Sequence, residues 1–291
     1  MITAYPFGFY LLGLHITGFG IMMMLAFLVG GWLVDRECRH QGFASDYAGD
    51  IIVGAVIGGI IGAKLWFAAL PGHGLATLTD RGGLVFYGGL VGGTIGVILN
   101  GWRRRVPMRW TAQLVAPSLA AAYAVGRVGC YVVGDDYGIP TTLPWGVRFP
   151  QGMPPTTAAN LRDFNVHIPL DVPATTIFAV HPTQLYEIGL MLVVFALLWR
   201  WRTSRRGTGW LFGAYLVLAG IERFGVEILR AKDDRLVGVF SVAQITSVVM
   251  VLVGAVIVTR LSPLPRADPG TWLAAKRSAA AAAPSGGTGT V

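Results

Sequence analysis

The chain has 291 residues, of which 54% are hydrophobic and 13% are charged. This charged share is about half that of a typical soluble domain, so the composition excludes an ordinary soluble enzyme and indicates surroundings that are mostly lipid. The formal net charge of +8 does not predict binding to nucleic acid, because the basic residues are sorted by loop.

Seven apolar stretches approach or exceed the ~20 residues that cross the hydrocarbon core of a bilayer. They predict an all-α fold, a polytopic membrane helix bundle with about seven transmembrane helices. The predicted spans are Ile16 to Val34, Asp50 to Leu70, Gly82 to Trp102, Thr111 to Val133, Gln184 to Arg200, Gly207 to Leu229 and Val239 to Val258.

The loops between these spans predict the orientation of the chain. Of the 23 Lys and Arg residues, 14 fall on one face and six on the other. The richer face is expected to be cytoplasmic, which places the C-terminus in the cytoplasm and the N-terminus outside. We expect no cleavable signal peptide, since the first residues carry no basic segment and no A-x-A site.

The regions outside the spans differ in character. The segment 134–182 is rich in Pro, Thr and Gly and too long for a simple connection, so we expect a cap on the outer face between spans four and five. Residues 1–262 are predicted to form a single integral-membrane domain. The low-complexity tail, 263–291, is predicted to be disordered and cytoplasmic.

Small residues recur at helical spacing in spans two and three, and they predict close approach of neighbouring helix backbones. The two stripes are Gly54, Gly58 and Gly62, and Gly88, Gly92 and Gly96. The two cysteines, Cys38 and Cys130, fall near opposite faces of the membrane in this topology, so we expect no disulfide between them.

Ionisable side chains inside the spans are the candidates for function, because each costs ~2.5–3.5 kcal/mol to insert. Arg127 lies near the outer end of span four, and Lys64 in the outer half of span two. Arg223, Glu227 and Arg230 follow one another at i, i+4 and i+7, which predicts one helical stripe approaching the same face.

These charges have both a structural and a functional interpretation. Arg223 and Glu227 could form an ion pair that ties helices together, and Arg127 could pair with Asp135 or Asp136 at a helix end. Counted together, the basic residues outnumber the acids, which favours spare guanidinium groups that bind a phosphate. The sequence has no P-loop, no zinc-ligand spacing and no Ser-His-Asp arrangement, so no metal and no cofactor are expected.

Four motifs carry a family resemblance: "GGLVFYGGLVGG", "GRVGCYVVGDDYG", "HPTQLYE" and "ERFGVEILR". In this order, across residues 14–258, they resemble the prolipoprotein diacylglyceryl transferase family. The resemblance implies a multi-pass transferase of the bacterial inner membrane. Its partners would be membrane lipids, phosphatidylglycerol among them, and preprolipoprotein signal peptides with a lipobox cysteine.

The implied reaction moves the sn-1,2-diacylglyceryl group of phosphatidylglycerol to the thiol of that cysteine, forming a thioether and releasing glycerol 1-phosphate. The resemblance implies that Arg127 and Arg223 bind the phosphate and stabilise charge on the leaving group, with Glu227 in the same site. The further implied or neighbouring substrate-binding positions are Asp135, Gly138, Gln184, Tyr186, Glu187, Arg230 and Lys64.

Four positions depart from the family's usual residues, and three of them, Asp135, Cys130 and Phe19, are implied substrate-binding positions. Asp135 replaces what is usually a Glu. Tyr87 stands where a histidine is frequent, and it is a candidate acid, base or hydrogen-bond partner in catalysis. Cys130 replaces the usual asparagine, and Phe19 replaces a tyrosine of the first span. A buried Cys130 would behave as a small apolar residue. These changes leave open a divergent relative that binds lipid or lipoprotein with altered or lost activity.

A different class, an anion transporter, would also use buried arginines. It requires a polar path to the cytoplasmic face, whereas the charged residues of spans two, four and six concentrate in their outer halves.

Overall fold

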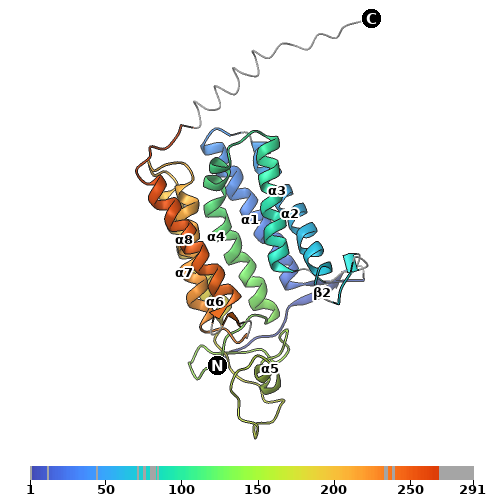
Figure 1. The fold of residues 1–291 in the computed structure, drawn as a ribbon. Helices are drawn as coiled ribbons and strands as arrows, with labels where there is room; N and C mark the ends of the chain where they lie inside the picture. Colours follow the sequence, from blue (N-terminus) through green and yellow to red (C-terminus); the bar gives the residue numbers. More distant parts are fainter. Residues whose placement is uncertain are drawn as a thin grey trace, which may run out of the picture. The chain divides into compact units, whose positions relative to one another are not determined.

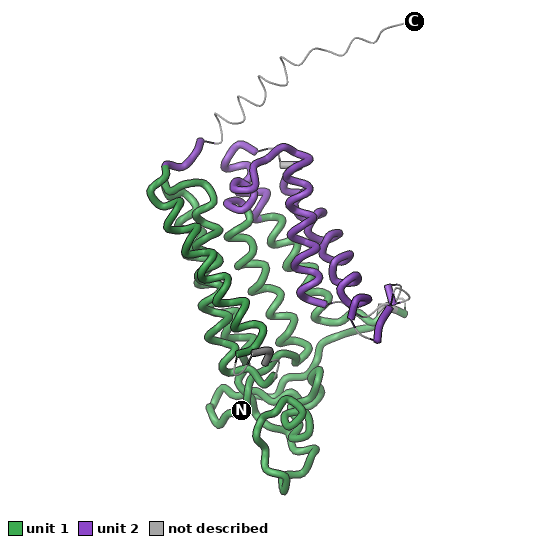
Figure 2. The backbone as a smooth tube through the Cα atoms, viewed as in Figure 1, with its two compact units in different colours: residues 1–32, 115–264 green, residues 33–114, 265–291 purple. Residues whose placement is uncertain are grey.

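The computed structural model describes residues 2–11, 13–43, 45–70, 72–74, 77–78, 83, 85–232, 235–237 and 240–268. The predicted disordered tail lies outside them from residue 269 onward. Two compact units are formed, coloured separately in Figure 2: the first comprises residues 1–32 and 115–264, and the second residues 33–114 and 265–291.

Seven long helices coincide with the seven predicted spans (Figure 1). They are α1 (Gly18–His40), α2 (Ser45–Ala68), α3 (Phe86–Arg103), α4 (Met108–Val133), α6 (Thr183–Trp201), α7 (Trp210–Glu227) and α8 (Val242–Leu261). By length and composition, five of them, α1, α2, α4, α6 and α8, can cross a membrane. The other two, α3 and α7, have 18 residues each, and their spanning stays a prediction.

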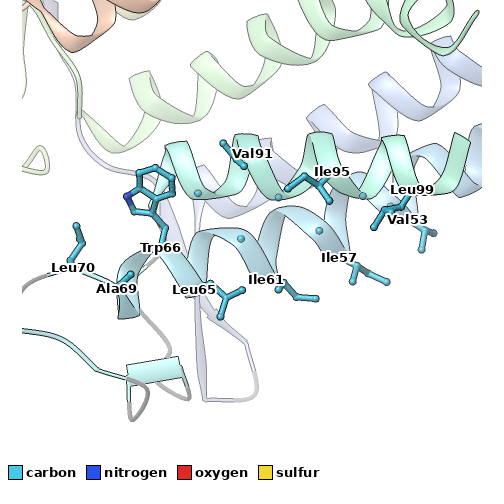
Figure 3. Close-up of a pocket in the computed structure, with 16 residues that line it drawn as sticks. Val53, Ile57, Ile61, Leu65, Trp66, Ala69, Leu70, Val91, Ile95 and Leu99 are labelled. Atoms are coloured by element: carbon cyan, nitrogen blue, oxygen red, sulfur yellow. The ribbon is translucent and has the colours of Figure 1, made fainter. Parts of the chain in front are cut away.

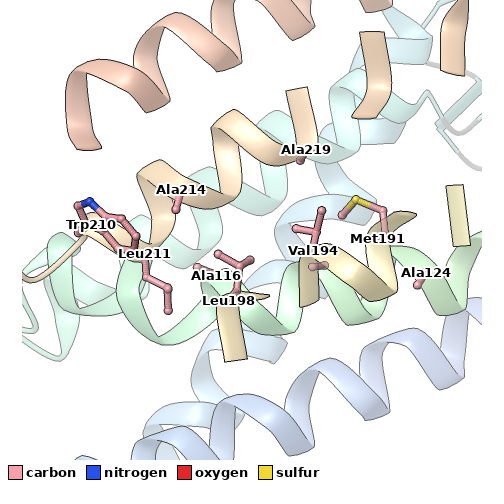
Figure 4. Close-up of a cluster of buried hydrophobic side chains, with 10 residues drawn as sticks. Ala116, Ala124, Met191, Val194, Leu198, Trp210, Leu211, Ala214 and Ala219 are labelled. Atoms are coloured by element: carbon pink, nitrogen blue, oxygen red, sulfur yellow. The ribbon is translucent and has the colours of Figure 1, made fainter. Parts of the chain in front are cut away.

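The core of the first unit lies between α4, α6 and α7 (Figure 4). Small residues of α4, Ala116 and Ala120, are fully buried and let the larger side chains of Leu198 and Leu211 pack closely. The last helix, α8, packs along α7 at a glycine contact, where a Cβ added to Gly213 would lie 2.9 Å from the Cβ of Ile257.

The segment 134–182, called the cap below, is folded and contains β4 (Val147–Arg148) and α5 (Ala158–Asp163). Phe149 and Leu161 belong to a small hydrophobic core that the segment forms together with Ala231, after α7. The backbone returns to the helices at a bridge between Gly138 and Arg230, and β4 pairs with β1 (Ile2–Thr3). The segment is therefore folded, while its place as a cap on the outer face stays a prediction.

Two short hairpins complete the described strands. The first joins β2 (Gly8–Leu11) to β3 (Leu14–Thr17) directly before α1, and the second joins β5 (Arg235–Val237) to β6 (Phe240–Ser241) before α8. Phe9 and Tyr10 of the first hairpin are exposed.

In the second unit, α2 and α3 touch backbone to backbone along the predicted glycine stripes. A Cβ on Gly58 would lie 2.3 Å from the carbonyl oxygen of Gly92, and one on Gly96 would lie 2.1 Å from that of Gly54. The expected close approach is confirmed. On one side of this contact lies an apolar groove of about 970 Å³, whose walls include Ile57, Ile61 and Ile95 (Figure 3).

Replacing Gly58 with alanine should destabilise this helix pair by about 1–3 kcal/mol, because the added methyl group meets a fixed backbone carbonyl. Gly59→Ala is the matched control, since its Cβ would lie 3.5 Å from the Gly89 carbonyl oxygen, an ordinary contact. Thermal unfolding in detergent measures both. Equal unfolding temperatures for the two variants would contradict the backbone contact.

Candidate functional site

The site is built around Arg127, six residues before the end of α4 and 9% exposed. Its Nη1 donates to Oδ2 of Asp136 at 2.9 Å and to Sγ of Cys130 at 3.2 Å, and its Nη2 contacts Oε2 of Glu187. The guanidinium carbon lies 5.6 Å from the ring centroid of Tyr123, one helical turn earlier. Glu187 comes from α6, which is distant in sequence, whereas Asp136 follows Arg127 by nine residues in the segment after α4.

The beginning of α6 supplies the next side chains. Gln184 and Glu187 are fully buried, and the Tyr123 hydroxyl donates to Oε1 of Glu187 at 3.0 Å. Nε2 of Gln184 donates to the backbone oxygen of Asp135 at 2.5 Å, and Oγ1 of Thr183 donates to that of Asp136 at 2.8 Å. The first turn of α6 thus fixes the chain that leaves α4.

Asp136 links Arg127 to Arg230, whose Nη2 contacts its Oδ1. Nη1 of Arg230 donates to Oε2 of Glu227 at 3.1 Å, and the same oxygen lies 2.6 Å from Nη1 of Arg223. The result is one continuous set of ion pairs, called the ion-pair network below. Its members are Arg127, Asp136, Glu187, Arg223, Glu227 and Arg230.

The prediction that Arg230 shares a helical stripe with Arg223 is wrong. Helix α7 ends at Glu227, and Arg230 lies in the following turn, where it forms a backbone bridge with Gly138. Arg230 still reaches Glu227 because the backbone continues from the helix end as a tight turn, in which the Arg230 N–H donates to the Glu227 carbonyl oxygen at 3.2 Å.

The expectation of spare positive charge is also wrong for this part of the chain. The network contains three arginines and three carboxylates, each in direct contact with a partner of opposite sign. Hydrogen-bond donors do remain: among the described residues, Nε of Arg127 and Nε of Arg230 have no partner. Arg223 has the most exposed side chain of the three arginines, at 20%.

The two acids that follow α4 have opposite electrostatic environments. Burial and the neighbouring charge of Asp136 raise the pKa of Asp135 to about 6. Burial acts in the same direction on Asp136, but Arg230 and Arg127 outweigh it and lower its pKa to about 2. The Asp136 carboxylate therefore stabilises the fold at pH values above 3.8, which is its pKa in the unfolded chain. This contribution to stability is lost as the pH falls toward 2.

For Asp135 the sign is reversed, because a raised pKa means that the folded state binds the proton more tightly. Its contribution to stability falls as the pH rises from about 4 to about 6. Asp135→Asn removes this dependence, so the variant's unfolding temperature should rise relative to that of the natural protein across this window. Thermal unfolding in detergent at pH 4, 5, 6 and 7 tests it, and a constant difference would contradict it.

Cys130 is not the apolar bystander that its position predicted, since its Sγ accepts a hydrogen bond from Arg127. It forms no disulfide with Cys38, and both are free, as expected. Ligand atoms of Cys130, Asp135 and Asp136 lie within 4.8 Å of one another, a spacing that could hold a metal ion. Guanidinium groups already contact both Asp136 oxygens, and an ion there would have to displace them.

The remaining predicted residues lie in three places. Tyr186 accepts a hydrogen bond from Nε1 of Trp145 at 2.8 Å, and its hydroxyl lies 3.2 Å from Nδ1 of His181. Phe19 packs on α4, with Cδ2 3.3 Å from a Cβ built on Gly129. Lys64 and Tyr87 belong to the second unit, and their part in the site stays a prediction.

Two residues of the site, Tyr123 and Glu222, were not predicted from the sequence. Tyr123 lies four residues before Arg127, and this spacing places both side chains on one helix face, so the sequence could have indicated it. Glu222 precedes Arg223 on α7 and is 7% exposed. Glu222 could also have been predicted, because it is a third ionisable residue in an apolar helix, and such residues are candidates for function.

Helices that can cross a membrane, with a buried ion-pair network where α4 and α7 end and α6 begins, define a multi-pass membrane protein with a polar site. The family model for prolipoprotein diacylglyceryl transferase matches residues 6–260. The chain belongs to this family.

Curated relatives agree with this membership, and each is named phosphatidylglycerol–prolipoprotein diacylglyceryl transferase. The protein of Clostridium tetani is 32% identical over 255 residues, covering 86% of this chain and 94% of its own. That of Bordetella bronchiseptica is 32% identical over 261 residues, covering 83% and 89%. That of Nitratidesulfovibrio vulgaris strain Hildenborough is 30% identical over 255 residues, covering 83% and 88%.

Proposed function

We propose that this protein transfers the sn-1,2-diacylglyceryl group of phosphatidylglycerol to the lipobox cysteine thiol of preprolipoproteins. The thiol sulfur forms a bond to the glyceryl carbon, the carbon–oxygen bond to phosphate breaks, and glycerol 1-phosphate leaves. Family membership over residues 6–260 supports the reaction. The observation that carries the site is the ion-pair network, which gathers three guanidinium groups at one end of the helices.

The phosphate is proposed to bind where the network still has donors. Arg223 is the most exposed of its arginines, and Nε of Arg127 and of Arg230 are available. A phosphate dianion or diester that enters would compete with the carboxylates for the guanidinium groups, which suit its oxygens bidentately. Charge that develops on the leaving phosphate in the transition state would then be stabilised by groups already held in place.

The enzyme needs no nucleophile of its own, because the attacking sulfur belongs to the peptide. The thiol must lose its proton, since the thiolate is the reactive species. Asp135 is a candidate acceptor, because its pKa of about 6 lies near neutral pH and its Oδ1 is buried without a hydrogen-bond partner among the described residues. Tyr87 remains the candidate implied by the family motif.

The proposed setting is the bacterial cytoplasmic membrane, with the N-terminus outside and the C-terminus in the cytoplasm. The excess of Lys and Arg on one set of loops supports this orientation. The cap and the ion-pair network would then lie at the outer face, where lipobox peptides emerge from the membrane. This orientation requires seven spans, two more than the five that length and composition support among the described residues.

The purified protein, supplied with phosphatidylglycerol and a lipobox peptide, should yield a peptide whose cysteine carries a diacylglyceryl thioether, identified by mass spectrometry. A peptide with serine in place of that cysteine is the control and should stay unmodified. Absence of product, while the Clostridium tetani relative is active under the same conditions, would refute the proposal. Arginine-dependent anion flux into liposomes would instead favour a transporter.

A further inference from the structure

Glu222 is a buried carboxyl group beside the ion-pair network that forms no ion pair of its own among the described contacts. It is 7% exposed, and its Oε1 has no hydrogen-bond partner. Its charge interacts with those of Glu187, Arg223 and Arg127, on α6, α7 and α4. Tyr123 and Tyr215 interact electrostatically with Glu222 as well. Helix α8, which packs along α7, has no titratable residue before Arg260.

The charge balance of the site leaves Glu222 without a cation of its own. The three arginines of the network are already paired with Asp136, Glu187 and Glu227. If Glu222 were ionised, it would be a buried fourth carboxylate without a cation of its own, and its charge would be repelled by that of Glu187. A protonated Glu222 avoids this cost, and its carboxyl group is then a hydrogen-bond donor.

Phosphate binding would create a need for such a donor. Glu187 is fully buried and contacts Arg127, so a phosphate that takes over this guanidinium leaves the Glu187 carboxylate short of a partner. The Tyr123 hydroxyl, at 3.0 Å from Oε1, supplies one hydrogen bond. A buried carboxylate needs more than one donor to remain ionised.

We propose that Glu222 is a positioning residue whose protonated carboxyl group donates a hydrogen bond to Glu187 and thereby releases Arg127 for the phosphate of the lipid. This inference rests on the proposed function and assigns Glu222 no contact with the substrate. It explains why a carboxyl group is kept in an apolar helix beside an existing ion pair.

The test compares Glu222→Gln with Glu222→Ala in the transfer assay. The amide keeps a neutral donor of the same shape, so the rate should stay within about threefold of the natural protein's. The alanine removes the donor, so KM for phosphatidylglycerol should rise about tenfold or more, with a smaller change in kcat. Ser247→Ala is the matched control, a buried polar residue of α8 whose hydroxyl donates within its own helix.

A double-mutant cycle separates positioning from simple packing. In a Glu187→Gln background, which removes the buried carboxylate, Glu222→Ala should cost at most about twofold more. Membrane levels and thermal unfolding are measured for every variant. Equal losses in Glu222→Gln and Glu222→Ala, or full additivity with Glu187→Gln, would overturn this role. An inactive natural protein would instead refute the proposed function itself.

Discussion

Replacing Arg127 with alanine is expected to lower the rate of thioether formation by about 10²–10³-fold, the usual cost of removing one group that stabilises developing charge. Among the described residues, Arg127 is the one whose side chain forms ion pairs with both Glu187 and Asp136. Without it, a fully buried carboxylate would lose its cation and the phosphate one of its ligands. Arg127→Lys should recover little of the lost activity, because an ammonium group cannot span both Glu187 and Asp136.

The control for this change is Arg39→Ala. Arg39 forms a surface ion pair with Asp35, and its side chain is 69% exposed. Such exposed ion pairs contribute little to the stability of a protein. Both variants should reach similar levels in the membrane, which immunoblotting measures alongside the transfer assay. A rate of thioether formation for Arg127→Ala within threefold of the rate of Arg39→Ala would show that Arg127 does not contribute to the reaction.

Replacing Gly138 with alanine should abolish most activity and destabilise the cap. A Cβ there would lie 2.5 Å from the backbone oxygen of Leu229, 2.8 Å from Cβ of His181 and 2.9 Å from Cγ2 of Thr183. The first two of these atoms are fixed by the backbone, so the backbone itself must shift. The shift would move the bridge to Arg230, and with it the link between Arg230 and Asp136.

We expect Gly138→Ala to lose at least about 10²-fold in kcat/KM, because small misplacement of catalytic groups is this costly. Gly225→Ala is the matched control: it lies on α7 close to the network, and a Cβ there meets nothing within 4 Å. Kinetics and thermal unfolding are measured on both. Near-normal activity of Gly138→Ala would show that the bridge does not position Arg230.

The helices could be predicted from the sequence because each is a long apolar stretch between charged loops, and all seven appear at the expected places. The glycine stripes of α2 and α3 were readable for a similar reason, since the period of a helix decides which residues share a face. The interior of the cap was not readable, because its short β4 and α5 depend on contacts distant in sequence.

The sequence predicted which residues belong to the site better than it predicted which of them contact one another. Arg127, Glu187 and Arg223 could be brought to one level from the topology, but spacing along a helix could not show that α7 ends at Glu227. The role of Asp136 as a bridge between two arginines depends on the chain reversal after α4, where its φ is +55°. Counting charges without knowing their partners produced the incorrect excess of cations.

The most direct test of the account measures both products of the reaction at once. With phosphatidylglycerol and a lipobox peptide, the purified protein should release glycerol 1-phosphate and form thioether-linked peptide in equal molar amounts, and both rates should fall together by about 10²–10³-fold in Arg127→Ala. Glycerol 1-phosphate without thioether, thioether without glycerol 1-phosphate, or equal yields from the Arg127→Ala variant would contradict a transferase in which the ion-pair network binds the leaving phosphate.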